Sequence, residues 1–205
     1  DIEEGKVAGS KITYFEGYLW DPPLAKDAIR LAAKIAHKHG RKLGHRREFA
    51  RAPDLHINGL QVTQSDAITR YVGKLTGLYP EDHLQALLCD EVMSALEDLN
   101  IKLGATFGLK GDDLKNARDA LVAGALPQYL RWLQSQLESH GGEYFADNRL
   151  TIADLKAFVI LRWLSSGKLD HIPSDLIATA APKLNDYMSR IASLPAIAQY
   201  YAHRD

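Results

Sequence analysis

The spacing of hydrophobic residues changes near Pro80, and this change predicts two domains. Residues 11–79 combine short alternating runs, which are typical of strands, with runs spaced by three and four, which are typical of helices. From residue 80 onward every strong pattern is helical. The sequence therefore predicts an α/β domain at residues 11–79 and an all-α domain at 80–205, after a polar, flexible tail at 1–10.

Two short runs in the first domain predict a β-hairpin. Asp54–Ile57 and Leu60–Thr63 each carry apolar residues at alternate positions. The dipeptide Asn58-Gly59 between them suits a two-residue turn that needs positive φ at both central positions. A further strand is predicted over Lys11–Glu16, and a helix from Leu24 to about Lys38.

A helix is expected directly after the hairpin, capped by Ser65 or Asp66. Its apolar face continues through Ala67, Ile68, Tyr71, Val72 and Leu75. The first N–H groups of a helix have no partner inside it and lie at the positive end of its dipole, so they can bind a carboxylate. Taken alone, Gln64-Ser65-Asp66 predicts a helix cap and nothing more.

The second domain is expected to consist of helices of different lengths. Leucines and other apolar residues from Leu84 to Leu103 recur at spacings of three and four, with Phe107 as the furthest expected end of that helix. Further helices are predicted over Asp113–Leu137, Asp175–Ala180, Lys183–Ala192 and Pro195–Ala202.

A capping box marks another helix start in the second domain. Thr151 can accept the N–H of Asp154, and the Asp154 carboxylate can accept the N–H of Thr151. Leu150 can pack on Leu155 across the turn. Such a cap is worth on the order of 1 kcal/mol and predicts a structural role rather than chemistry.

Composition narrows the choice of environment and partners. The chain has 205 residues, of which 46% are hydrophobic, and a net charge of -1, so no global field favours nucleic acid or an anionic membrane. No apolar run approaches the ~20 residues of a membrane span, and we expect no signal peptide and a cytoplasmic location. The single cysteine, Cys89, is expected to be buried and inert. His37, His39 and His45 lack acidic or cysteine ligands at a useful spacing, so no metal site is predicted.

The order of proline, hairpin and Gln-Ser pair resembles the glutathione-binding half of the cytosolic glutathione S-transferases. The resemblance implies a thioredoxin-like N-terminal domain followed by a C-terminal helical-bundle domain. It also implies a cis peptide bond between Ala52 and Pro53, with the Ala52 backbone pairing with the cysteinyl part of glutathione. Gln64 and Ser65 match the family's residues for the γ-glutamyl end, and Asp66 stands where many members have Asn or Asp.

Tyr14, in Lys11-Ile12-Thr13-Tyr14-Phe15, matches the catalytic tyrosine of the alpha, mu, pi and sigma classes. A thiol has a pKa of about 8.5, so little of it is nucleophilic thiolate at neutral pH. One hydroxyl donating to the sulfur anion is worth roughly 1.5–3 kcal/mol, which lowers the thiol pKa by about one to two units. Tyr14 is therefore the expected catalytic residue.

The resemblance also covers two places in the helical domain. Asp98, in Glu97-Asp98-Leu99, matches an aspartate that in several classes reaches across the dimer to the γ-glutamyl ammonium of the partner's ligand. Thr151 and Asp154 resemble a buried capping box that serves folding in the family. The resemblance therefore implies a homodimer.

Two segments depart from the family pattern. The loop from Glu16 to Pro23 is longer by about five residues and lacks both of the family's arginines, for which Lys26 is a poor substitute. Residues 41–50 are too few for the strand and short helix that members have before the proline. Because this segment is basic, Lys42 or a nearby arginine is expected to hold the glycine carboxylate of glutathione.

These features imply a dimeric, tyrosine-type glutathione S-transferase nearest the sigma and pi classes. It would conjugate glutathione to a small hydrophobic electrophile, with no cofactor beyond glutathione as co-substrate, no metal, and no nucleic-acid or membrane partner. Two alternatives stay open: a related protein that binds without catalysis, and a glutathione-dependent isomerase. No motif names the electrophile or separates detoxification from biosynthesis.

Overall fold

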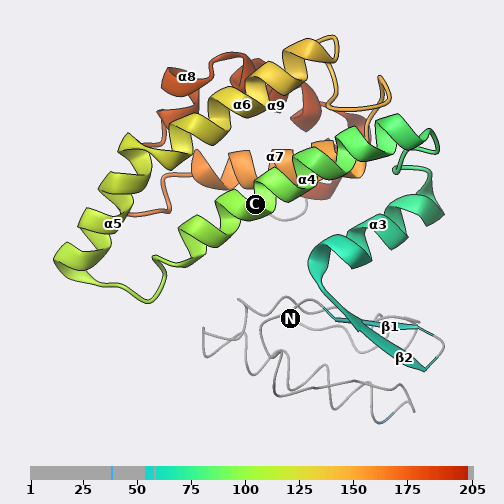
Figure 1. The fold of residues 1–205 in the computed structure, drawn as a ribbon, viewed down its shortest axis with the longest axis horizontal. Coiled ribbons are helices and arrows are strands. Elements are labelled where there is room, and N and C mark those ends of the chain that lie inside the picture. Colours follow the sequence, from blue (N-terminus) through green and yellow to red (C-terminus); the bar gives the residue numbers. More distant parts are fainter. Residues whose placement is uncertain (1–37, 39–53, 58, 203–205) are drawn as a thin grey trace. The chain divides into compact units, whose positions relative to one another are not determined.

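The computed structural model describes residues 38, 54–57 and 59–202, and its first element is a β-hairpin (Figure 1). Strand β1 (Asp54–Ile57) pairs antiparallel with β2 (Leu60–Thr63), so that Leu55 lies opposite Val62. In the turn, Gly59 has a φ of 80°, which glycine adopts without steric cost. Both predicted strands are confirmed with their predicted ends.

The earlier predicted elements lie outside the described residues. They are the strand over 11–16 and the helix from 24 to about 38, of which only Lys38 is described, as helical. The first helix that is described over its full length is α3 (Ser65–Thr76), which follows β2 directly.

The buried side of helix α3 is not the apolar face that the sequence predicted. Of its predicted apolar face, Tyr71, Val72 and Leu75 are exposed, and the buried residue is Gly73. The reason is a close backbone approach: a Cβ added at Gly73 would lie 2.7 Å from Cγ2 of Ile152. A side chain is therefore disfavoured at Gly73, the buried residue of α3.

The chain forms two compact units, Asp1–Val72 and Gly73–Asp205, and the division falls within α3. We call the second the helical unit. Its seven further helices are α4 (His83–Gly104), α5 (Gly111–Ala123), α6 (Ala125–Ser139), α7 (Ile152–Leu164), α8 (Leu176–Ala180), α9 (Lys183–Ala192) and α10 (Pro195–Ala202). Within the described residues, no helix is both long enough and apolar enough to cross a membrane.

The core of the helical unit is formed by the inward rows of α4, α6, α7 and α9. Helix α7 packs against α4 and α9, and α6 packs against α4 and α8 (Figure 1). Each row repeats at helical spacing, and its members are almost completely buried: Val92, Leu96, Leu99, Leu103, Leu126, Leu130, Leu133, Leu137, Ala157, Leu161, Leu164, Leu184, Tyr187 and Ile191. Burial of these side chains is the main source of stability for the unit.

The helix predicted over Asp113–Leu137 is wrong as a single element, because it is broken at Gly124. Gly124 has φ −125° and ψ −92°, outside helical values, and separates α5 from α6. Pro127 follows in the first turn of α6, and it has no N–H to donate to the carbonyl of Ala123. The hydrophobic spacing continues across the break, which is why the pattern alone predicted one helix.

The remaining helix ends are close to prediction. Helix α4 stops at Gly104 and does not reach Phe107, and the hydroxyl of Thr106 donates to the Leu103 carbonyl at 2.7 Å beyond its end. Helix α8 begins one residue later than predicted, while α9 and α10 have their predicted ends.

The segment between α3 and α4 is tied to the start of α7. The N–H of Ile152 donates to the carbonyl of Leu78 at 2.9 Å. The guanidinium of Arg149 donates to the carbonyls of Gly77 and Tyr79 and pairs with Asp147 at 2.7 Å. Residues 73–79 are therefore held within the helical unit by backbone contacts as well as by packing.

Replacing Gly73 with alanine should test the close approach of α3 to α7. Alanine favours a helix by about 1 kcal/mol over glycine. Its Cβ would, however, lie 2.7 Å from Ile152 Cγ2 and 3.3 Å from Tyr79 Cβ, so the packing must shift. Overpacking of this kind costs about 1–3 kcal/mol, and we expect a net loss of unfolding free energy in urea denaturation.

Gly104→Ala is the matched control, because nothing lies within 4 Å of a Cβ added there. It should be neutral or stabilise the protein by up to about 1 kcal/mol. If Gly73→Ala and Gly104→Ala raised the unfolding free energy equally, the close approach of α3 to α7 would be refuted.

Candidate functional site

The junction between β2 and α3 brings the predicted residues Gln64, Ser65 and Asp66 together. Gln64 has a φ of 80°, which is uncommon for a residue other than glycine. It turns the chain from strand to helix in one step, and its carbonyl accepts the N–H of Ile68 at 3.1 Å. Residues held in such backbone conformations cluster at ligand sites.

The predicted cap of α3 is displaced by one residue. The helix begins at Ser65, so Gln64 rather than Ser65 or Asp66 occupies the flanking position. The left-handed conformation of Gln64 is the reason, because it makes the turn before Ser65. Ser65 and Asp66 therefore lie in the first turn of the helix.

This first turn offers groups of both signs to a ligand. N–H groups of the first helical turn have no partner within the helix and can receive a carboxylate. Ser65 and Asp66 are half-buried residues, and Gln64 is an exposed one. A carboxylate acceptor beside N–H donors suits the ammonium and carboxylate of an α-amino acid.

Four of the predicted site residues lie outside the described residues. They are Tyr14, Lys42, Ala52 and Pro53, and with them the expected cis peptide bond. The loop from Glu16 to Pro23 and the short basic segment at 41–50 also lie outside them.

On α4 the two neighbouring acidic residues have different surroundings. Glu97 pairs with the ammonium of Lys156 at 2.9 Å, and the same ammonium donates to the Met93 carbonyl at 3.1 Å. Asp98 is exposed. Asp98 is therefore the more exposed of the two, since Glu97 is half-buried.

Asp98 belongs to an exposed row along α4. The row has spacings of three and four and consists of Leu84, Leu87, Glu91, Ser94, Asp98 and Ile101. Its apolar members are exposed by 60% at Leu84, 63% at Leu87 and 62% at Ile101. Apolar side chains this exposed, in a regular row, are typical of a surface that contacts another protein.

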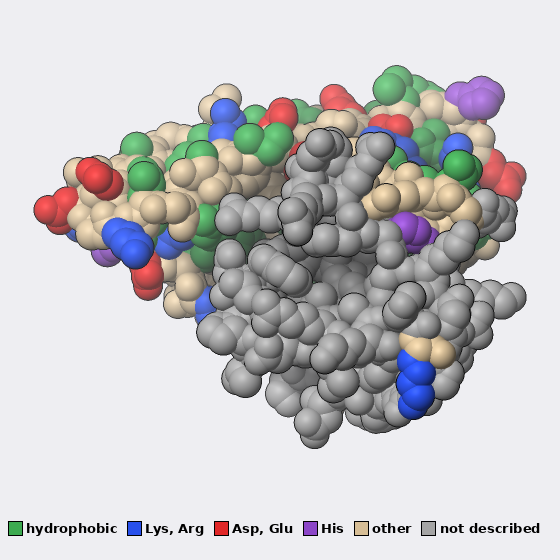
Figure 2. Space-filling model, turned by 90° about the horizontal axis from the view of Figure 1, so that it is seen from below, with side chains coloured by type: hydrophobic (Ala, Val, Ile, Leu, Met, Phe, Trp, Pro, Cys, Tyr) green, Lys and Arg blue, Asp and Glu red, His purple; other side chains and the backbone are tan. Residues whose placement is uncertain are grey.

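The described residues of one face carry charges of both signs. On the face seen in Figure 2, acidic and basic side chains of the described residues are interspersed, in keeping with the net charge of -1. Among the described residues, no group of three or more His, Cys, Asp or Glu side chains is placed to hold a metal ion.

The capping box at α7 is confirmed, and it is structural. Thr151 and Asp154 are completely buried. Oδ2 of Asp154 accepts the N–H and the hydroxyl of Thr151, both at 2.8 Å. Oδ1 accepts the N–H of Phe145 and the hydroxyl of Tyr187, both at 3.1 Å.

Burial dominates the electrostatics of this network. It raises the pKa of Asp154, while the hydrogen bonds from Thr151, Phe145 and Tyr187 act in the opposite direction. Burial and the neighbouring Asp154 charge raise the pKa of Tyr187 well above its usual value, so its hydroxyl remains a donor. Phe145 and Tyr187 were missed by the sequence reasoning, because no local pattern relates them to Asp154.

Cys89 is not a nucleophile. Its side chain is completely buried on α4, as predicted. Burial raises the pKa of its thiol to about 11, so the thiol is protonated at neutral pH.

Comparison with known proteins identifies similar chains. The sequence model of the family described as "Glutathione S-transferase, C-terminal domain" matches residues 97–204, which is more than half of the chain. The chain is 29% identical to mouse glutathione S-transferase A2 over 153 residues, 74% of this chain and 66% of that protein. It is 28% identical to glutathione S-transferase 3 of Caenorhabditis elegans over 157 residues, 74% of this chain and 73% of that protein.

Solved structures agree with these relatives. The prostaglandin synthase D of Nilaparvata lugens has a TM-score of 0.67 at 24% identity, covering 77% of this chain and 76% of that one. The sigma class GST of Fasciola hepatica has a TM-score of 0.63 at 22% identity, covering 76% and 73%. They confirm the predicted fold class, a thioredoxin-like domain followed by a helical domain.

Proposed function

Since this chain belongs to the glutathione S-transferase family, we propose that it binds glutathione and transfers it to a small hydrophobic electrophile. The observation that carries the proposal is the junction between β2 and α3. There the left-handed Gln64 brings Ser65 and Asp66 into the first turn of a helix, with donors and a carboxylate for the γ-glutamyl end of glutathione.

Each candidate residue has a distinct role in this proposal. Gln64, Ser65 and Asp66 hold the γ-glutamyl group, the Ala52 backbone before Pro53 holds the cysteinyl part, and Lys42 or a neighbouring arginine holds the glycine carboxylate. Holding glutathione in one orientation converts a bimolecular encounter into an effectively unimolecular step.

The chemical step is a nucleophilic substitution or addition by sulfur. The glutathione thiol loses its proton to solvent water, and the Tyr14 hydroxyl donates a hydrogen bond to the thiolate. The sulfur electron pair then forms a bond to an electrophilic carbon. In a substitution the leaving group departs with the pair of its broken bond, and in an addition the π pair moves to the neighbouring atom, which takes up a proton from solvent. The step needs no metal and no cofactor besides glutathione.

Ser65→Ala tests the proposed binding site. Loss of one hydrogen bond to a charged group costs roughly 1.5–3 kcal/mol, so the affinity for glutathione should fall about tenfold or more. The turnover number at saturating glutathione should change little, because Ser65 does not touch the sulfur. Isothermal titration and initial rates measure the two quantities.

Thr69→Ala is the control for this experiment, because Thr69 lies one turn further along α3. Glutathione affinity should be unchanged in that variant. Equal affinity of Ser65→Ala and the unaltered protein would exclude Ser65 from the site.

We extend the proposal to a homodimer in which Asp98 contacts the ammonium of the partner's glutathione. It is supported by the exposed row of α4, in which Leu84, Leu87 and Ile101 leave apolar surface uncovered beside Asp98. Light scattering should give the mass of two chains, and Leu87→Asp should give that of one, because a charge would be buried in the interface. A monomeric unaltered protein would contradict this extension.

A second candidate function is glutathione-dependent isomerisation. It is favoured by the likeness to the prostaglandin synthase D of Nilaparvata lugens. In such a reaction the thiolate adds to the substrate and is later expelled, so glutathione is regenerated. Following free thiol during turnover separates the two: a transferase consumes one thiol per product, and an isomerase consumes none.

A further inference from the structure

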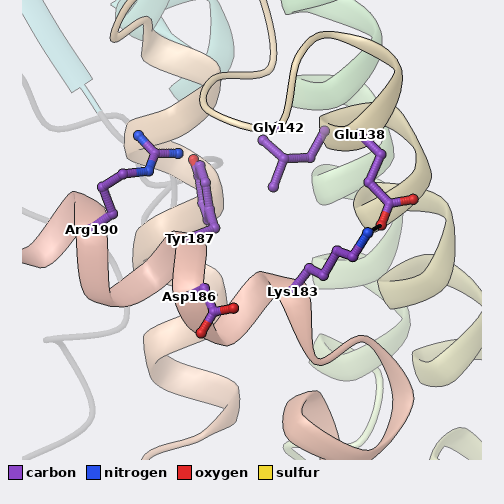
Figure 3. A pocket seen from close by; sticks show the side chains of 7 residues that line it. Glu138, Gly142, Lys183, Asp186, Tyr187 and Arg190 are labelled. Atoms are coloured by element: carbon purple, nitrogen blue, oxygen red, sulfur yellow. Dashed lines mark ion pairs between the residues drawn. The ribbon is translucent and has the colours of Figure 1, made fainter.

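A cavity of 260 Å³ lies in the helical unit, between the end of α6 and the face of α9 (Figure 3). Its lining comes from Leu137 and Glu138 of α6, Gly142 after it, and Lys183, Asp186, Tyr187 and Arg190 of α9. Ligand pockets usually occupy about 300–1,000 Å³, so this cavity lies just below the usual range and has room only for a very small molecule. The cavity shares no residue with the proposed glutathione site.

Arg190 lies at one end of the cavity with its guanidinium already oriented. The guanidinium carbon is 5.0 Å from the ring centre of Tyr144 and 5.6 Å from that of Tyr187, and one N–H group donates to the carbonyl of Glu143. Among the described residues, no carboxylate pairs with Arg190. A planar guanidinium held by aromatic rings is the group best suited to receive a carboxylate through two parallel bonds.

The floor of the cavity is apolar. Leu137 and Tyr187 are almost completely buried beneath it. The Tyr187 hydroxyl is already engaged by Asp154 at 3.1 Å, so Tyr187 offers its ring to the cavity rather than its hydroxyl. This floor suits a short hydrocarbon body.

The other end is bordered by an exposed ion pair. Lys183 and Glu138 lie 2.6 Å apart, with 66% and 40% of their side chains exposed, and Figure 3 shows the pair opposite Arg190. Exposed pairs contribute little, about 0–1 kcal/mol, so Glu138 can be displaced from Lys183 cheaply. In Figure 3 the Asp186 carboxylate points away from the space between Tyr187 and Glu138. Arg190 is thus the cation of the cavity that lacks a counter-charge.

We infer that this cavity binds a small organic carboxylate, with the carboxylate on Arg190 and a short apolar body over Leu137 and Tyr187. The inference goes beyond the proposed function and does not depend on it. Because Tyr187 also holds the capping box of α7, an occupant of the cavity adds to the stability of the helical unit.

Titration of the full chain with sodium hexanoate, followed by amide chemical shifts, tests the inference. Shifts should move in Leu137, Gly142 and Tyr187 and saturate, and sodium sulfate at equal ionic strength should not reproduce them. Arg190→Lys keeps the charge and loses the planar fork, and it should weaken hexanoate binding by about tenfold. Unmoved shifts, an equal response to sulfate, or unchanged affinity in Arg190→Lys would overturn the inference.

Glu138→Gln gives a second readout that does not put the fold at risk, because Glu138 is exposed. Removing its negative charge lowers the repulsion of the bound carboxylate and should tighten hexanoate binding about two- to fivefold. The matched control is Asp119→Asn, which breaks the exposed pair of Lys115 and Asp119 (2.5 Å) on α5 and should leave the affinity unchanged. Equal effects of the two variants would show a general charge effect and would also overturn the inference.

Discussion

Replacing Tyr14 with phenylalanine is expected to slow glutathione conjugation by roughly ten- to a hundredfold, the equivalent of the 1.5–3 kcal/mol that a hydrogen bond to a charged group supplies. Affinity for glutathione should stay nearly the same, because in the proposed mechanism the hydroxyl acts on the sulfur and not on the groups that anchor the tripeptide. Initial rates with chlorodinitrobenzene at saturating glutathione measure the first effect, and titration measures the second.

The pH dependence of the rate provides an independent readout of the same substitution. A donor to the thiolate lowers the pKa of bound glutathione, so the rate of the unaltered protein should reach its plateau at lower pH. In Tyr14→Phe the midpoint should move upward by about one to two pH units. A purely structural role for Tyr14 would lower the rate at every pH without moving the midpoint.

Tyr71→Phe is the control, since Tyr71 is an exposed tyrosine of α3. Its rate and midpoint should match those of the unaltered protein. Equal activity of Tyr14→Phe would remove Tyr14 from the mechanism. Tight glutathione binding with no turnover in any variant would instead favour a protein that binds without catalysis.

Replacing Asp154 with alanine should cause the largest loss of stability, about 3–5 kcal/mol. Four donors converge on this buried carboxylate, from Thr151, Phe145 and Tyr187, at 2.8 to 3.1 Å. After the substitution they are left buried without their acceptor, which costs more than the loss of a surface hydrogen bond. Globular domains have about 5–15 kcal/mol of stability in total, so urea unfolding should show a large shift of midpoint.

Asp82→Ala is the matched control, because Asp82 caps α4 in solvent. Its Oδ1 accepts the N–H groups of Leu84 at 3.0 Å and Gln85 at 2.9 Å. Loss of such a cap costs about 0.5–2 kcal/mol. If Asp154→Ala cost no more than Asp82→Ala, the buried network would be no stronger than an ordinary cap.

Part of the fold was predictable because it depends on sequence patterns only a few residues long. Alternating apolar residues around Asn58-Gly59 predicted β1 and β2, and Thr151 with Asp154 predicted the start of α7. The junction at Gln64–Asp66 was predictable to within one residue for the same reason, since the strand, turn and helix start are contiguous in sequence.

Features that depend on distant contacts were not predictable. Spacing alone could not place the break at Gly124, because leucines continue at helical intervals on both sides of it. The buried side of α3 is decided by Ile152, and the partner of Asp154 at Tyr187 is 33 positions away. Such pairs form because whole helices pack together, so no local pattern in a single sequence predicts them.

The fastening of Gly73–Tyr79 to the start of α7 has a consequence for recombining this chain with its relatives. The spacing of hydrophobic residues changes at Tyr79–Pro80. A splice there would replace Gly73 and Leu78, which contact Ile152, with the residues of a relative. A splice at Val72–Gly73 keeps these seven residues with the helices they were selected to fit. The last turn of α3 and the segment after it should therefore be kept with the helical unit. Chimaeras joined at Val72–Gly73 should fold more readily than chimaeras joined at Tyr79–Pro80.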